Sequence, residues 1–188
     1  MFEAQLKENL VSKHKAIFKN FLELTKQEMR KSYFDPSEEV SYILEFKVYW
    51  LMYILTFKNN AAREYLVNEL DFMKYIEVQA EKYIDLLKYI IKTEGNSKNN
   101  KEAFSDVKKD SIVKTTKKFC ELVYYLFFQD KDQLKIILNK KESPKFNSLL
   151  KLYEDNREAF YTTSSSSDDK FDVFVWFKKL EKANKSTD

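Results

Sequence analysis

Apolar residues recur every three to four positions along most of the chain, which is the spacing of an α-helix with one buried side. Polar and charged residues fill the positions between them. The first segment with this pattern covers residues 3–33, and its apolar positions are Leu6, Leu10, Ile17, Phe21, Leu22 and Met29. The spacing predicts a long amphipathic helix over this segment.

A second helix is predicted directly after the first. Asp35 can cap it, Pro36 suits its first turn, and Glu38 completes a capping box. Apolar residues then cover most of the helix circumference up to about Lys58. A helix that is apolar on all sides is usually buried on all sides, so we expect this one to lie between neighbouring elements.

Polar and turn-forming residues divide the rest of the chain into shorter units. We expect loops at 93–104 and 162–167 and a disordered tail at 184–188. Residues 1–183 are therefore predicted to form a single helical domain. The further helices predicted within it are 61–68, 71–92, 105–129, 131–139, 144–161 and 168–180.

The composition supports an all-α fold. The 188 residues, 44% hydrophobic and 34% charged, suit a globular chain that can bury a core. They include one Gly and two Pro, although the turns of a sheet need such residues and phosphate-binding loops need several glycines. We therefore expect helices and no sheet.

Two stretches of the chain are similar to each other. Residues 51–76 and 122–150 align when one is shifted by 71 positions and three residues are added in the second copy. Both contain the end of an apolar helix, a polar turn, a short helix and an aromatic residue that begins the next helix. The identical pairs are Tyr53 with Tyr124, Leu55 with Leu126, Phe57 with Phe128 and Asn68 with Asn139. An internal repeat of this kind predicts stacked units and predicts that the two copies superpose.

This helix order resembles armadillo-type and HEAT-type repeats, in which short and long helices stack into a curved solenoid. The resemblance implies an armadillo-like α-solenoid of about two and a half repeats. Residues 3–57 would be a partial unit that lacks its first helix. The short helices 61–68 and 131–139 would be first helices, 71–92 and 144–161 second helices, and 105–129 and 168–180 third helices.

The chain departs from that family in two respects. Its period of 71 exceeds the usual repeat of about 40 residues, and Leu70-Asp71 and Glu142-Ser143 stand where a Gly is usual. An unrelated helical bundle is the alternative fold. Family members that bind basic peptides carry Trp followed four residues later by Asn, whereas Ile54 follows Trp50 here. That function is therefore not implied.

The residues do not predict an enzyme. His14 and Cys120 are the only His and Cys, and they lie in different predicted helices, so we expect no nucleophile–base pair, metal centre or cofactor. A single cysteine excludes an internal disulfide and favours a reducing compartment, cytoplasmic or nuclear. The first ten residues lack an apolar signal core, and no apolar run reaches the roughly 18 residues that a membrane span needs.

The predicted function is to bind another protein on the third-helix side, as an adaptor, a scaffold or a regulatory subunit. In the helix 105–129 we expect Ile112, Phe119, Leu122, Tyr125 and Leu126 on the inward side. The expected partner-binding residues on its open side are Lys114, Lys117, Lys118, Glu121 and Tyr124. The alternative is binding to RNA or to an anionic membrane surface through residues 98–151, which contain 13 Lys against 7 Asp and Glu.

Overall fold

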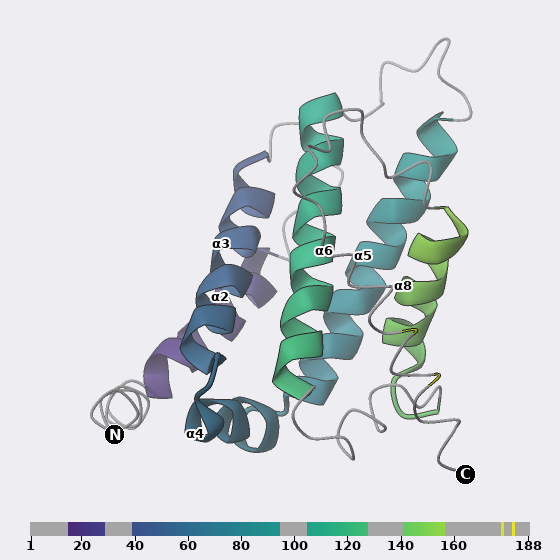
Figure 1. Ribbon diagram of the computed structural model, residues 1–188. Coiled ribbons are helices and arrows are strands. Elements are labelled where there is room, and N and C mark those ends of the chain that lie inside the picture. The colour runs from purple at the N-terminus through teal and green to yellow at the C-terminus, as the bar shows by residue number, and fades with distance from the viewer. Residues whose placement is uncertain are drawn as a thin grey trace.

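The computed structural model describes residues 15–28, 39–94, 105–127 and 141–156, together with Lys178 and Lys182. All regular elements in these residues are helical, which confirms the all-α prediction for the described part of the chain (Figure 1). The elements are α2 (Lys15–Glu28), α3 (Glu39–Thr56), α4 (Asn60–Glu64), the π-helical turn η1 (Tyr65–Glu69), α5 (Phe72–Glu94), α6 (Asp106–Phe127) and α8 (Pro144–Asp155).

The helix boundaries agree with the polar breaks in the sequence. Helices α5 and α6 begin and end within two residues of the predicted ranges. The break after α3 contains Lys58 in the left-handed region, with φ of 54°, and Asn59, whose side chain accepts from the Ala62 amide at 3.2 Å. Asn59 is thus the N-cap of α4. The short helix predicted at 61–68 is α4 followed by the π-helical turn.

The long helices form two pairs whose members lie side by side and run in the same direction. Helix α3 packs along α6, and α5 packs along α8. The ring of Tyr49 lies 5.5 Å from Phe119, and that of Tyr53 lies 4.6 Å from Tyr125, so the numbering rises together along α3 and α6. Helix α8 starts beside the first turns of α5 and follows it in the same direction (Figure 1). Helix α2 lies behind α3, and α5 lies behind α6.

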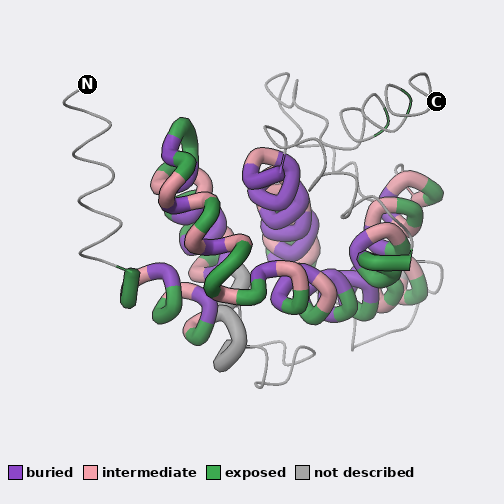
Figure 2. The backbone as a smooth tube through the Cα atoms, turned by 90° about the horizontal axis from the view of Figure 1, so that it is seen from below, coloured by how far each residue is buried: buried purple, intermediate pink, exposed green. Residues whose placement is uncertain are grey.

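The core lies where these helices meet, and Phe119 is at its centre. Its ring contacts Tyr49 of α3 and, at 5.4 Å and 6.1 Å, Tyr83 of α5 and Phe146 of α8. Buried residues gather along these contacts and exposed residues along the outer turns (Figure 2). The predicted inward side of α6 is confirmed at Ile112, Phe119, Leu122 and Leu126, which are all buried.

The start of α8 is held by a side chain from α5. Pro144 occupies its first turn as predicted, but Ser143 makes no side-chain capping bond. The Glu77 carboxylate instead accepts from the amides of Lys145 and Phe146, at 2.9 Å and 3.1 Å. Negative charge is favourable at a helix N-terminus, so this contact fixes α8 on α5.

Several sequence predictions lie outside the described residues. These are the helices at 131–139 and 168–180 apart from Lys178, the loop at 162–167 and the tail at 184–188. Because the second copy of the repeat includes residues 128–140, the superposition of the two copies stays a prediction. Among the described helices, none has the length and apolar character needed to cross a membrane.

Candidate binding surface

One side of α3 exposes a row of large apolar side chains to solvent. The row, here called the α3 stripe, consists of Ile43, Trp50, Leu51, Ile54 and Phe57, each 39% to 49% exposed. Steps of three, four and seven residues place these positions on one side of the helix. The expectation that α3 lies between neighbours on all sides is therefore wrong.

The opposite side of α3 explains this correction. Val48, Tyr49 and Met52 are fully or almost fully buried against the rest of the molecule. These residues already supply the apolar side that a surface helix needs for packing. The α3 stripe is a second apolar side on the same helix, and no described helix covers it.

Aromatic rings connect the α3 stripe to α6. Phe57 lies 5.6 Å from Tyr53, and Tyr53 lies 4.6 Å from Tyr125 on α6. Tyr53 and Tyr125 are half-buried, so both rings contribute to the surface. The open sides of the two helices thus form one surface, apolar on α3 and mainly charged on α6.

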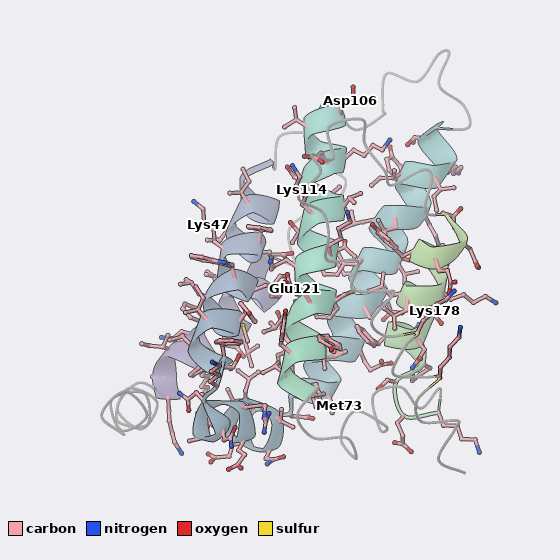
Figure 3. The ribbon with its side chains drawn as sticks, viewed as in Figure 1. Lys47, Met73, Asp106, Lys114, Glu121 and Lys178 are labelled. Carbon is pink, nitrogen blue, oxygen red and sulfur yellow. The ribbon has the colours of Figure 1, made fainter. Side chains whose placement is uncertain are left out.

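The charged residues predicted for partner binding lie along α6 (Figure 3). Lys114 is exposed and forms an ion pair with Asp110, at 2.7 Å. Lys118 pairs with Glu121, and its ammonium group lies 5.8 Å from the centre of the Phe46 ring of α3. Lys117 is half-buried. The expected open side of α6 is thus exposed or half-buried at these four positions.

Tyr124 does not belong to this open side, and the expectation that it does is wrong. It is only 3% exposed, and burial raises the pKa of its phenol. The cause is a second buried row on α6, in which Cys120, Val123, Tyr124 and Phe127 follow the helical spacing. The predicted inward side of this helix includes only the row of residues that contains Phe119. The adjacent Tyr125, which was expected to point inward, is half-buried and lies at the surface instead.

A cluster of polar groups lies inside the molecule between α3 and α5. The Glu45 carboxylate pairs with the Lys82 ammonium group and accepts from the Tyr83 hydroxyl at 2.8 Å. The Tyr83 hydroxyl also lies 3.1 Å from that of Tyr49. Burial, followed by the charge of Glu45, raises the pKa of Tyr83, so this phenol stays a donor at neutral pH.

This cluster is closed to solvent. Glu45, Lys82, Tyr49 and Tyr83 are all buried, and no substrate can reach their polar atoms without opening of the fold. Every group in it has a charged or hydrogen-bonding partner, which is what permits burial of such groups. We therefore assign the cluster a structural role, namely to join α3 to α5.

The other reactive residues do not add a site. Cys120 is buried, and burial raises the pKa of its thiol, which keeps it protonated and unreactive. His14 lies outside the described residues. Across 15–28, 39–94, 105–127 and 141–156, no group of three or more His, Cys, Asp and Glu side chains is arranged to hold a metal ion.

Comparison with known proteins does not add a relative. No protein-family model, no curated protein and no solved structure matches the chain.

The α3 stripe was not predicted from the sequence, although the sequence contains a signal for it. The apolar residues of this helix exceed the number that one buried side requires.

Proposed function

We propose that the chain is a non-enzymatic interaction module, serving as an adaptor, a scaffold or a regulatory subunit, that binds another protein on the open side of α3 and α6. The observation that carries this proposal is the α3 stripe, a row of large apolar side chains left in water on a fold whose core is complete without it. Contiguous apolar surface bordered by polar residues is typical of protein-binding sites.

We also propose that the helices belong to an armadillo-like solenoid of about two and a half repeats. In such an architecture equivalent helices of successive units lie next to each other. The parallel pairs α3 with α6 and α5 with α8 support this assignment, with α3 and α6 as third helices and α5 and α8 as second helices. The binding surface is then the third-helix side, and a cytoplasmic or nuclear location fits the single buried thiol.

The binding surface combines residues of both helices. Trp50 and Ile54 are its centre, because large apolar side chains, Trp above all, supply most of the binding energy in protein interfaces. Lys114, Lys117, Lys118 and Glu121 form its charged border on α6. Tyr125 replaces Tyr124 as the aromatic residue contributed by α6.

Binding of RNA or of an anionic membrane surface through the Lys-rich region is less well supported. Lys114 and Lys118 lie next to the carboxylates of Asp110 and Glu121, which neutralise much of the charge that phosphates would need. The dependence on salt separates the two functions. Affinity for phosphates falls steeply as salt increases, whereas an interface with an apolar centre changes little.

The experiment that tests the proposal compares the full chain with a double variant, Trp50→Ala with Ile54→Ala. Tagged proteins are used to capture partners from an extract of the native cell, and captured proteins are quantified by mass spectrometry. We expect partners retained by the wild type to fall at least tenfold with the double variant, because the centre of the apolar surface is lost.

The matched control is Val78→Ala, which shortens an apolar side chain on α5 that is 42% exposed. Circular dichroism melts establish that each variant is folded, since exposed side chains contribute little to stability. Equal capture of the same proteins by wild type, control and double variant would place the binding site elsewhere and contradict the proposal.

A further inference from the structure

The spacing of the α3 stripe matches the surface on which a second helix packs. From Ile43 the positions 47, 50, 54 and 57 follow in alternating steps of four and three residues, and all but Lys47 are apolar. Alternating steps of this kind are the two contact positions of a heptad pattern. The row runs from residue 43 to residue 57, about 21 Å along the helix axis, which is long enough to hold about four turns of a partner helix.

A helix is also the partner that an exposed helix side can accept. The main-chain groups of α3 are used within the helix between its ends, so they cannot pair with an extended peptide as a sheet edge would. Recognition must therefore come from side chains that interdigitate. Lys47 and its neighbours in the stripe, Trp50, Leu51 and Ile54, have the spacing of the four-residue hole that receives one side chain of a packed helix.

The charge of this surface is positive. Lys47 is exposed within the stripe and has no ion pair in the described part of the chain. Lys58 is exposed at the end of the stripe, with its ammonium group 5.4 Å from the centre of the Phe57 ring. The carboxylates on the neighbouring helix, Asp110 and Glu121, are paired with Lys114 and Lys118. The complementary partner is therefore acidic.

From the spacing and the charge together we infer that the α3 stripe binds an acidic amphipathic helix, whose apolar side packs on Trp50 and Ile54 and whose Asp or Glu side chain pairs with Lys47. This inference rests on the proposed function and specifies the partner. An ion pair at the border of an apolar interface orients the partner and selects against basic helices.

A second copy of the chain fits this surface less well. Two α3 helices packed antiparallel about Trp50 would place the two Lys47 side chains only about 9 Å apart along the helix axis. Like charges at that separation disfavour association. An anionic membrane surface would match the charge, but it would not select a helical spacing, and it is therefore an outcome that the test must detect.

The test uses three synthetic helical peptides of 21 residues that share Leu at both heptad contact positions. Their flanking positions carry Glu in the first peptide, Gln in the second and Lys in the third. The protein is the full chain with Trp176→Phe, so that Trp50 is its only tryptophan and reports directly on the stripe. Peptide anisotropy gives the affinity, and a shift of Trp50 emission to shorter wavelength locates binding.

We expect the Glu peptide to bind at least tenfold more tightly than the Lys peptide and to shift Trp50 emission. Lys47→Glu should reverse this preference, while the matched reversal Lys88→Glu, at an exposed position of α5, should leave it unchanged. A preference that follows the charge at position 47 identifies Lys47 as the residue that selects the partner's charge.

Three results would overturn the inference. The first is equal affinity for all three peptides, or no affinity for any of them. The second is a Trp50 shift caused by phosphatidylserine vesicles and not by the Glu peptide, which would assign the stripe to a membrane surface. The third is a Trp50 shift that grows with protein concentration alone, together with a dimer in sedimentation analysis, which would assign the stripe to a second copy.

The capture experiment keeps failure of this inference distinct from failure of the proposed function. If the peptides do not discriminate but native partners still depend on Trp50 and Ile54, the module binds a protein of other chemistry. If native partners are captured equally without Trp50 and Ile54, the proposed function itself is wrong at this surface.

Discussion

The two sides of α3 differ in how far they are buried, although their residues are neighbours along one helix. Tyr49 is fully buried and Trp50, the next residue, is 49% exposed. The buried side contains a carboxylate, Glu45, whose charge is matched by Lys82. The exposed side contains the five apolar residues of the α3 stripe and leaves them in water. The buried side is thus mainly apolar with one matched charge, and the exposed side has large apolar residues that no described helix covers.

The difference separates the side of α3 that the fold needs for packing from the side that no described helix covers. The buried side joins α3 to α5 and α6 through ring contacts and the Glu45 cluster, so its loss should disturb the whole core. No described helix covers the α3 stripe. Removal of apolar surface from water stabilises by about 25 cal/mol for each Å². A partner that covers the stripe would obtain this free energy on binding.

The largest effect should follow from Tyr49→Ala. The substitution removes a buried ring that touches Phe119 and leaves a cavity between α3 and α6. We expect a loss of roughly 3–5 kcal/mol in the free energy of unfolding, as for other buried aromatic residues. Urea denaturation followed by circular dichroism measures it.

The matched control at the same position is Tyr49→Phe. It keeps the ring and removes only the hydroxyl that lies 3.1 Å from that of Tyr83. We expect a loss of about 1 kcal/mol, the net value of one hydrogen bond. A cost for Tyr49→Ala no greater than that of Tyr49→Phe would mean that the ring does not hold the helices together.

The next largest effect should follow from Glu45→Gln. Gln retains the size of Glu and an oxygen for the Tyr83 hydroxyl, but the buried Lys82 loses the negative charge with which it pairs. We expect a loss of about 3 kcal/mol, because removal of one partner of a buried ion pair is strongly destabilising. The measurement is again urea denaturation.

The double variant Glu45→Gln with Lys82→Met shows whether the charge of Lys82 causes the loss of stability in Glu45→Gln. Replacing both members of a buried ion pair by uncharged residues of similar size is often close to neutral. We therefore expect it to recover most of the stability lost by Glu45→Gln. A double variant less stable than either single variant would mean that the two side chains matter for their shape and not for their charges.

The fold was largely predictable because helices depend on local spacing. The buried row of α6 and the limits of α5 follow from a 3.6-residue period and from polar breaks, both of which are visible in the sequence. The capping of α8 was not predictable. Glu77, which accepts from the amides at its start, lies 68 and 69 residues earlier in the chain, and such a contact depends on how the helices pack.

The candidate site was predictable only in part, for a related reason. Periodicity placed Lys114, Lys118 and Glu121 on the open side of α6, but it could not tell that Tyr124 belongs to a second buried row. In α3 apolar residues lie on both sides, so their spacing alone does not show which side is buried. Which side faces the core depends on the partners α5 and α6, and these are fixed by tertiary packing and not by α3 itself.

The smallest effect should follow from Trp50→Ala, and it tests the comparison most directly because Trp50 adjoins Tyr49. The side chain is half-exposed and lies on the side of α3 that no described helix covers. We expect a loss below about 1 kcal/mol, against several for Tyr49→Ala, since substitutions at the surface cost little. Circular dichroism in urea is the suitable measurement, because the substitution removes the tryptophan whose fluorescence would otherwise report on this helix.

A loss above about 2 kcal/mol for Trp50→Ala would mean that the stripe is packed in solution. Repeating the titration over a hundredfold range of protein concentration would then separate the two occupants, since association with a second copy makes stability depend on concentration and cover by the same chain does not.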